Sequence, residues 1–435
     1  MLQESVASNC ATFGCQFKSA QGNREPLVAM SSIPSMLTVD EALARILAAA
    51  TPLAAETAAI ADAFGRSTCE EVRARRTVPP WDNSAMDGYA LRSADVTAAP
   101  VRLQVIETIY AGQLPRHQIG RGECSRIMTG GPLPAGADAV AMQERTRPCG
   151  DHEVEILEPV AAGSFVRPRG EDAREGEMLL PKGTAIGIAE AALLWSQGYS
   201  EVRVPRRPRL ALLSTGDELS SVEAAASGKI IDSNSPALSL ASANCGAAVT
   251  GLGIARDNAE ELRQALANRS GHDVVITTGG ASVGARDFVR DALLAAGAEV
   301  IFWKVAIKPG KPVLFARRAS TLFFGLPGNP TSSLVSFELF VRPALRRMTG
   351  RADAVVPSIR GRTEVEVSKP AGLTHFIRAT TRSRDGELWA TPLETQTSGA
   401  IRSMVGATHL MVVPSQTTHL AAGDAVMLHP VSWQR

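Results

Sequence analysis

The chain has 435 residues, a hydrophobic content of 45% and a formal net charge of +1 at pH 7. The length predicts two to four domains at roughly 100–200 residues each, and the balanced charge excludes a global basic field for holding a nucleic-acid backbone. The six cysteines form no CxxC pair, so we expect no structural zinc site, no disulfide framework and a cytoplasmic, reducing location. No run of 18 apolar residues exists, so no segment is expected to cross a membrane.

The first half of the chain predicts a tail, two helices and a β-rich module. Residues 1–35 have no hydrophobic period and predict a flexible tail, or sequence upstream of the true start. Thr38 and Glu41 form a capping box that begins a helix, and an alanine-rich helix is predicted over 53–63. Residues 66–205 alternate short β-type runs with Gly/Pro turns. The basic run 204–209 is interpreted as a linker, whose charge is most simply that of a solvated hinge.

The second half predicts an α/β unit followed by a small β domain. Residues 209–350 alternate apolar strands with helices, which implies a mostly parallel sheet. Pro312–Ala316 and Thr321–Gly325 are expected to form a hairpin within it. Residues 358–435 return to period-2 runs with regular turns, which favours a small barrel or sandwich.

Three predicted strands of the α/β unit end in glycine-bearing loops, at residues 214–218, 277–282 and 326–333. In an open parallel sheet these strand ends lie along one edge, which is the usual ligand crevice. Glycine lets backbone N–H groups approach an anion, and each following helix adds its positive dipole. No Walker A motif is present. One such loop alone is more often an ordinary strand-to-helix turn, but three on one edge favour an anion-binding crevice.

Four carboxylates fall at or just after these strand ends: Asp217, Glu218, Asp232 and Asp287. Carboxylates beside an anion-binding loop repel phosphate unless a cation lies between them. Mg²⁺ held by one or two carboxylates and by substrate phosphates resolves this conflict. Helix capping is the alternative for Asp287 and for Asp232.

A lysine cluster follows the fourth predicted strand. Lys304 and Lys308 are four positions apart, which places them on one face of an extended strand, and Lys311 lies past a Pro-Gly turn. Lysines opposite an acidic metal site suit an oxyanion substrate. The alternative is an edge strand that lysines protect from pairing.

These runs together resemble the molybdopterin molybdenumtransferase family (MoeA-type, the class that includes the gephyrin C-terminal module) over about residues 38–430. The motifs that carry the resemblance are DNSAMDGYA at 82–90, IMTG at 127–130, GED at 170–172, STGDEL at 214–219, DSN at 232–234, TGGASVG at 278–284, KPGKP at 308–312 and GLPGNP at 325–330. After GLPGNP the family usually has Val-Ser-Ala, whereas this chain has Thr331-Ser332-Ser333 and keeps a hydroxyl at Ser332.

The resemblance implies a multidomain α/β fold in four parts. They are an elongated α+β dimerisation segment (36–77 and 168–205), a β-rich lid domain (78–167), a molybdopterin-binding α/β domain with a mostly parallel sheet (206–350) and a C-terminal small β-barrel (355–435). It also implies a homodimer in which the lid of one subunit faces the α/β domain of the other.

The implied reaction takes adenylylated molybdopterin and molybdate with Mg²⁺ as cofactor, releases AMP and inserts molybdenum, without nucleic acid or membrane partners. The implied catalytic residues are Asp87, Thr129, Asp172, Glu218 and Asp287. The implied metal ligands are Asp217, Glu218, Asp232 and Asp287. The residues implied in substrate binding are Asp217, Asp232, Ser233, Asn234, Gly279, Gly280, Ser282, Lys304, Lys308, Lys311, Pro327, Gly328, Asn329, Ser332, Arg378 and Ser398.

Two other functions stay open at this point. A related α/β domain in sister proteins adenylylates molybdopterin with ATP, although the lid and barrel favour the later step. A gephyrin-like scaffold is the other, and such a protein would have lost the acidic and lysine positions that this chain retains.

Overall fold

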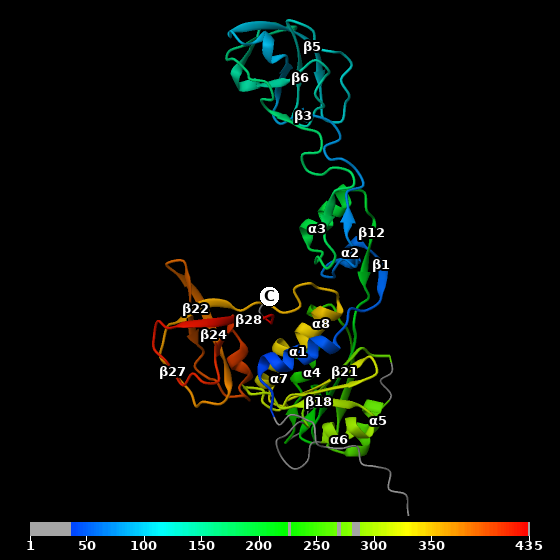
Figure 1. The fold of residues 1–435 in the computed structure, drawn as a ribbon, viewed down its shortest axis with the longest axis vertical. Coiled ribbons are helices and arrows are strands. Elements are labelled where there is room, and N and C mark those ends of the chain that lie inside the picture. Colours follow the sequence, from blue (N-terminus) through cyan, green and yellow to red (C-terminus); the bar gives the residue numbers. More distant parts are fainter. Residues whose placement is uncertain (1–35, 225–227, 268–270, 281–287, 434–435) are drawn as a thin grey trace, which may run out of the picture.

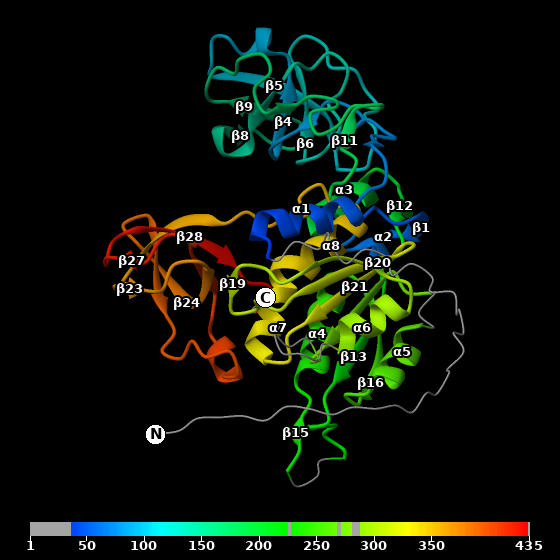
Figure 2. The same cartoon turned by 60° about the horizontal axis from the view of Figure 1, so that its bottom comes forward.

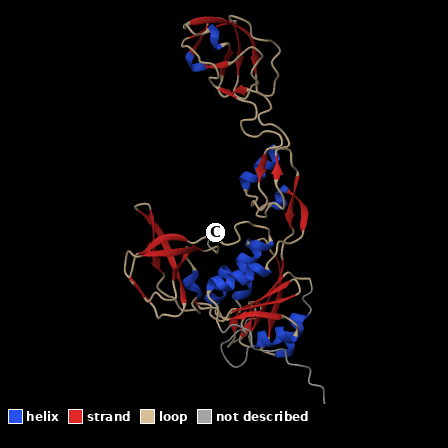
Figure 3. Cartoon of the chain, viewed as in Figure 1, coloured by secondary structure: helices blue, strands red, loops and turns tan. Residues whose placement is uncertain are grey.

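The structure is a computed structural model that describes residues 36–224, 228–267, 271–280 and 288–433. Figure 1 shows an elongated chain with an outer β part at one end, a small connecting part in the middle, and an α/β part beside a barrel at the other end. Strands dominate the outer part and the barrel, and the longest helices cluster in the α/β part (Figure 3). The tail predicted over residues 1–35 lies outside the described residues, and the predicted domain boundaries stay predictions.

The connecting part is built from two separate stretches of the chain. The predicted capping box is present, because Thr38 Oγ1 accepts the Glu41 N–H at 3.3 Å and Glu41 Oε2 accepts the Thr38 N–H at 2.8 Å. The helix that it begins packs Ile46 against the α/β part. This helix, α1 (Val39–Ala49), lies on the α/β part (Figure 1), and the elements of the connecting part itself are β1 (Ala55–Ala59), α2 (Ile60–Ala63), β2 (Val72–Arg73), β11 (Met178–Leu180), α3 (Ile188–Ser196) and β12 (Glu201–Pro205).

Two predictions about this part are wrong. Residues 55–59 form a strand rather than a helix, because they pair antiparallel with β12, and this tertiary pairing overrides the helix propensity of alanine. The predicted linker at 204–209 is also shorter, because β12 continues to Pro205 and the next strand begins at Arg209.

The outer β part confirms the predicted β-rich module. Its six-stranded sheet has the order β7-β4-β6-β5-β9-β8. The elements are β3 (Asn83–Ser84), β4 (Gly88–Leu91), η1 (Ser93–Asp95), β5 (Val101–Ile109), β6 (Glu123–Ile127), β7 (Ala139–Met142), η2 (Gln143–Arg145), β8 (Thr146–Pro148), β9 (Glu153–Ile156) and β10 (Val166–Arg167).

The α/β part contains a six-stranded sheet of order β16-β13-β17-β21-β20-β18, in which the first four strands are parallel and the predicted hairpin is antiparallel. Its strands are β13 (Arg209–Thr215), β14 (Leu219–Ser220), β15 (Ile230–Ile231), β16 (Ala248–Ala255), β17 (Val274–Thr278), β18 (Glu299–Trp303), β19 (Ile307–Lys308), β20 (Leu314–Arg318) and β21 (Thr321–Leu326). Its helices are α4 (Asn234–Asn244), α5 (Ala259–Ala267), α6 (Phe288–Ala295), α7 (Pro330–Ser336), the π-helical turn η3 (Phe337–Val341) and α8 (Arg342–Met348).

Helices cover both faces of this sheet. Leu212 packs with residues of α4 and α7, whereas its neighbour Leu213 packs with residues of α5 and α6. Adjacent strand residues point to opposite faces, so a continuous apolar run is what a sheet buried on both sides requires. The pair β14–β15 projects beyond this layered body (Figure 2).

The C-terminal part is a closed five-stranded barrel, as predicted. β24 pairs with both β25 and β26, which closes the ring through β22 and β28. The elements are β22 (Ile359–Thr363), β23 (Val367–Ser368), β24 (Thr374–Arg384), β25 (Glu387–Pro392), η4 (Ile401–Met404), β26 (His409–Val413), β27 (His419–Leu420) and β28 (Ala425–Pro430). Within the described ranges, no helix has the length and apolarity needed to cross a membrane.

Candidate active site

The carboxyl ends of β13, β17 and β21 meet at one edge of the sheet, as the sequence predicts, and their loops surround a cavity of about 590 Å³. We call this cavity the strand-end crevice. The predicted residues that line it are Glu218, Asp232, Ser233, Asn234, Gly279, Gly280, Pro327, Gly328 and Asn329. Ser282 and Asp287 lie outside the described residues.

Gly279 allows two of these loops to approach closely. Its φ is +90°, and a Cβ atom built there would lie 2.1 Å from the backbone oxygen of Thr215. An L-side chain is strained at this φ, and the contact is with backbone that has no flexible end to move. The Thr215 and Gly279 loops therefore form a crevice wall that only glycine permits.

Asn234 ties the crevice loops together from the start of α4. Its side-chain N–H₂ donates to Thr278 Oγ1 at 2.9 Å and to the Gly328 carbonyl oxygen at 2.7 Å. One amide thereby links the loops that follow β17 and β21.

Replacing Asn234 with alanine should lower the free energy of unfolding by about 1–3 kcal/mol, because it removes two hydrogen bonds, to Thr278 and to Gly328, that contribute about 0.5–1.5 kcal/mol each. Urea denaturation of both variants measures the effect. The control is Asn244→Ala at the exposed far end of the same helix, which should change stability by less than about 0.5 kcal/mol. Equal losses of unfolding free energy in the two variants would contradict a stabilising role for the Asn234 hydrogen bonds.

Asp232 caps α4. Its Oδ1 accepts the backbone N–H groups of Asn234 and Ser235 at 3.0 and 3.1 Å, and its Oδ2 accepts the Ser214 hydroxyl at 2.7 Å. These are the contacts of the capping alternative. Its predicted role as a metal ligand stays a prediction.

A second acidic group gathers beside the crevice. Asp257 follows β16, and its backbone N–H donates to Asp217 Oδ1 at 3.4 Å. Burial, together with the charges of Glu218 and Asp217, raises the pKa of Asp257 above its ordinary value. Its buried Oδ1 finds no hydrogen-bond donor among the described residues. Asp257 was not predicted from the sequence, although it follows a strand end closely, as the predicted carboxylates do.

A second cavity, of about 660 Å³, lies between the α/β part and the barrel, and we call it the lysine pocket. Its predicted lining residues are Lys308, Lys311, Asn329, Ser332 and Ser398. It shares Asn329 and Pro312 with the strand-end crevice, so the two cavities adjoin.

Direct hydrogen bonds join the two halves of the lysine pocket. Asn329 Nδ2 donates to Ser398 Oγ at 3.0 Å, and Thr331 Oγ1 donates to the Ser398 carbonyl oxygen at 2.6 Å. On the other side, β19 pairs with β24, which places Lys308 opposite His375. Burial and the charges of Lys308 and Lys369 lower the pKa of His375 to about 4, so at neutral pH the pocket's positive charge comes from its lysines.

Lys304 does not join this pocket, and its predicted placement beside Lys308 is wrong. The strand ends at Trp303, and Lys304 has a φ of +90°, which turns the chain and breaks the two-residue alternation. Its ammonium lies over the Trp303 ring, 4.0 Å from the centroid, which is a cation–π contact.

Arg378 stands behind the pocket wall rather than in it. Its side chain is fully buried, and it is not among the described residues that line the pocket. Its Nη2 donates to the carbonyl oxygens of Thr395 and Thr397 at 3.1 and 3.3 Å. The guanidinium therefore holds the loop that presents Ser398.

The three predicted catalytic residues of the first half lie apart from both cavities within one chain. Asp87 and Thr129 contact each other in the outer β part, where Asp87 Oδ1 accepts the Thr129 N–H and hydroxyl at 2.7 Å each. Asp172 lies where the chain leaves that part, and its N–H donates to the Val78 carbonyl oxygen at 3.0 Å. The connecting part lies between the outer β part and the α/β part (Figure 1).

Replacing Thr129 with alanine should raise the pKa of Asp87. The backbone and side-chain hydrogen bonds of Thr129 hold this pKa below its ordinary value, and the variant loses the second of them. Because the folded pKa is depressed, this contribution to stability is present above the ordinary aspartate value of about 3.9 and is lost as the pH falls through the folded value. An NMR titration of Asp87 measures the change, and Thr108→Ala, at an exposed position of β5, should leave that titration unaltered.

Comparison with known proteins covers nearly all of the described chain. Family models match residues 37–198 ("MoeA N-terminal region (domain I and II)"), 211–347 ("Probable molybdopterin binding domain") and 360–431 ("MoeA C-terminal region (domain IV)"). A molybdopterin molybdenumtransferase of Bacillus subtilis is 34% identical over 403 residues, which are 90% of this chain and 93% of that protein. One from a Nostoc species is 35% identical over 380 residues, which are 84% and 86% of the two chains.

Solved structures agree with the sequence comparison. A crystal structure of a molybdopterin biosynthesis MoeA protein from Pyrococcus horikoshii has a TM-score of 0.74 and 31% identity, and covers 91% of this chain and 99% of that one. A second crystal structure of a molybdopterin biosynthesis MoeA protein, from Pyrococcus horikoshii OT3, has a TM-score of 0.77 and 27% identity with the same coverage. The chain belongs to the molybdopterin molybdenumtransferase family of enzymes.

Proposed function

We propose that this enzyme inserts molybdenum from molybdate into adenylylated molybdopterin and releases AMP. The observation that carries the proposal is the shared wall of Asn329 and Pro312 between an acidic, glycine-lined crevice and a lysine-lined pocket. A reaction that cleaves an adenylyl–phosphate link and takes molybdenum from an inorganic oxyanion needs both a site for the organic phosphates and an adjoining site for the oxyanion.

The strand-end crevice suits the phosphate-bearing substrate. Gly328 exposes its backbone to the crevice because it has no side chain, and α4 begins at the same cavity with Asn234. The lysine pocket suits molybdate, since Lys308 and Lys311 supply charge and Ser332 and Ser398 supply hydroxyl donors. In this proposal the strand-end crevice binds the phosphates and the pterin, and the lysine pocket binds the oxyanion.

Mg²⁺ fits the acidic side of the crevice. Asp217, Glu218 and Asp257 supply the oxygen donors that this ion prefers, and the buried Asp257 Oδ1 lacks a hydrogen-bond partner among the described residues. Among the described residues no group of three or more His, Cys, Asp or Glu is arranged to hold a metal, so one or two of these carboxylates would share the ion with substrate phosphates. When bound, Mg²⁺ would neutralise charge on the phosphates during cleavage. Asp287, which lies outside the described residues, is proposed as a further ligand.

The active form is proposed to be a homodimer in the cytoplasm. The connecting part exposes large apolar side chains, with Ile188 81% and Trp195 54% exposed on α3 and Phe64 55% exposed nearby, and a second copy would cover them. Such a dimer lets Asp87, Thr129 and Asp172 of one chain close the crevice of the other. The described cysteines are free, and a reducing compartment would keep them so.

Crystals grown with molybdate test the assignment of the pockets. Molybdenum scatters X-rays anomalously, so its position is measured independently of the protein coordinates. The proposal expects an anomalous peak between Lys308 and Ser398. A peak confined to other sites would contradict the oxyanion role of the lysine pocket.

A further inference from the structure

The lysine pocket is complete only when the barrel is correctly placed against the α/β part. Lys308, Asn329 and Ser332 come from the α/β part, whereas Ser398 comes from the barrel. Whatever fixes the barrel therefore fixes the pocket. This argument rests on the proposed function for the identity of the ligand, but the mechanical connection is independent of it.

One long helix, α7–η3–α8, carries several of the contacts between the two parts, and the pairing of β19 with β24 supplies others. Near its start, Thr331 donates to Ser398. Further along, Glu338 is 1% exposed, and its Oε2 accepts the Ser432 hydroxyl at 2.6 Å and the Ser432 N–H at 3.3 Å. Ser432 follows β28, the last barrel strand, so the helix holds the barrel where the chain leaves it.

Glu338 is a buried carboxylate in this contact, and its surroundings keep it charged. Burial would raise its pKa, but His429, Arg342 and the Ser432 hydroxyl outweigh burial and hold the pKa below its ordinary value. Arg342 forms an ion pair with Glu338 one turn along the helix, and His429 Nε2 of β28 lies 3.6 Å from its Oε1. Burying a carboxylate costs free energy unless it is paired in this way, so separating Glu338 from its partners would be unfavourable.

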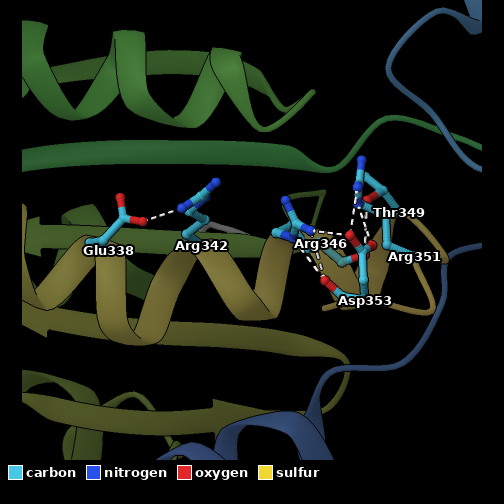
Figure 4. A network of polar contacts seen from close by, with 6 residues as sticks. All are labelled: Glu338, Arg342, Arg346, Thr349, Arg351 and Asp353. Carbon is cyan, nitrogen blue, oxygen red and sulfur yellow. Dashed lines mark hydrogen bonds and ion pairs between the residues drawn. The ribbon is translucent and has the colours of Figure 1, made fainter. Parts of the chain in front are cut away.

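The same helix also holds the barrel where the chain enters it. Asp353 precedes the first barrel strand. Its Oδ2 accepts an N–H of Arg346 at 2.7 Å and its Oδ1 accepts an N–H of Arg351 at 2.8 Å (Figure 4). Glu338 and Arg342 lie along the same helix in that view. The entry and exit segments of the barrel are thus both attached to one rigid element.

We propose that Glu338 is a positioning residue of the active site, which grips the exit segment at Ser432 and thereby holds Ser398 in place opposite Lys308. The contacts at Ser398 and the short pairing of β19 with β24 both lie at the lysine pocket. Glu338 lies seven residues after Thr331, about 10 Å along a helix. A further attachment at that distance limits tilting of the barrel about the pocket.

The test compares Ser432→Ala and Glu338→Gln with Ser383→Ala, an exposed serine elsewhere in the barrel, in the full-length protein. Hydrogen–deuterium exchange reports the mobility of residues 374–378 and 395–398, and calorimetry measures the affinities for molybdate and for AMP. Ser432→Ala should speed exchange in both segments and weaken molybdate binding about tenfold, with AMP affinity changed less than twofold. Glu338→Gln, which retains an acceptor for Ser432, should have an intermediate effect.

Unchanged exchange in these segments would overturn the proposal, as would equal losses of molybdate and AMP affinity in Ser432→Ala. If the unaltered protein bound no molybdate, the assignment of the pocket would fail. The exchange data would still decide whether Glu338 positions the barrel.

Discussion

Replacing Lys308 with alanine is expected to raise the KM for molybdate by about tenfold to a hundredfold and to leave the affinity for AMP close to that of the unaltered enzyme. Lys308 lines the lysine pocket but not the strand-end crevice. A hydrogen bond to a charged group contributes about 1.5–3 kcal/mol, and each 1.4 kcal/mol corresponds to a factor of ten. Steady-state kinetics with varied molybdate and calorimetry with AMP separate the two effects.

The control for this variant is Lys182→Ala, an exposed lysine in the connecting part. It removes the same charge from the whole protein without touching either cavity, so its kinetics should match those of the unaltered enzyme. A loss of AMP affinity in Lys308→Ala as large as the loss for molybdate would contradict the separate roles of the two cavities.

Gly279→Ala is expected to have the largest effect on both stability and turnover. The new Cβ would lie 2.1 Å from the Thr215 oxygen at a φ of +90°. Overpacking costs about 1–3 kcal/mol and a strained φ costs a similar amount. Because the clash forces apart the loops after β13 and β17, turnover should fall at least about a hundredfold. Urea denaturation and AMP release measure the two losses.

Gly253→Ala separates the clash from the strain. Gly253 has a similar φ of +82° in β16, but a Cβ there meets no atom within 4 Å. This variant should show the cost of strain alone, with turnover largely retained. If it lost activity as severely as Gly279→Ala, close approach of the two loops would not explain the need for glycine.

Local sequence signals predicted most of the crevice. Gly279, Asn329 and Glu218 follow apolar runs that become parallel strands, and parallel order alone brings strand ends to one edge. The capping box at Thr38 is equally local and is present. These features needed no knowledge of which strands are neighbours.

Features that depend on distant pairing were predicted less well. Residues 55–59 are a strand because β12, about 145 residues later in the chain, pairs with them. A positive φ turns Lys304 away from the strand face, and a lysine in the sequence does not predict a positive φ. Asp257 was missed because its neighbour Asn258 gave a sufficient reason, helix capping, for the polar residues there.

The role of Arg378 shows a third limit. The family resemblance places it with oxyanion-binding groups, but its fully buried guanidinium holds the backbone of the 395–397 loop. Sequence identifies the residue, whereas burial distinguishes a group that lines a pocket from one that shapes it. Its predicted direct contact with substrate stays a prediction, as do those of Ser282 and Asp287.

The central claim is that the crevice and the lysine pocket are one active site for molybdenum insertion. Its most direct test mixes the enzyme with adenylylated molybdopterin, molybdate and Mg²⁺, and measures AMP released and molybdenum bound to the pterin. The account predicts that both products form in equal amounts, and that ATP with metal-free molybdopterin gives no reaction. Well-folded enzyme that released no AMP, or that consumed ATP instead, would contradict it.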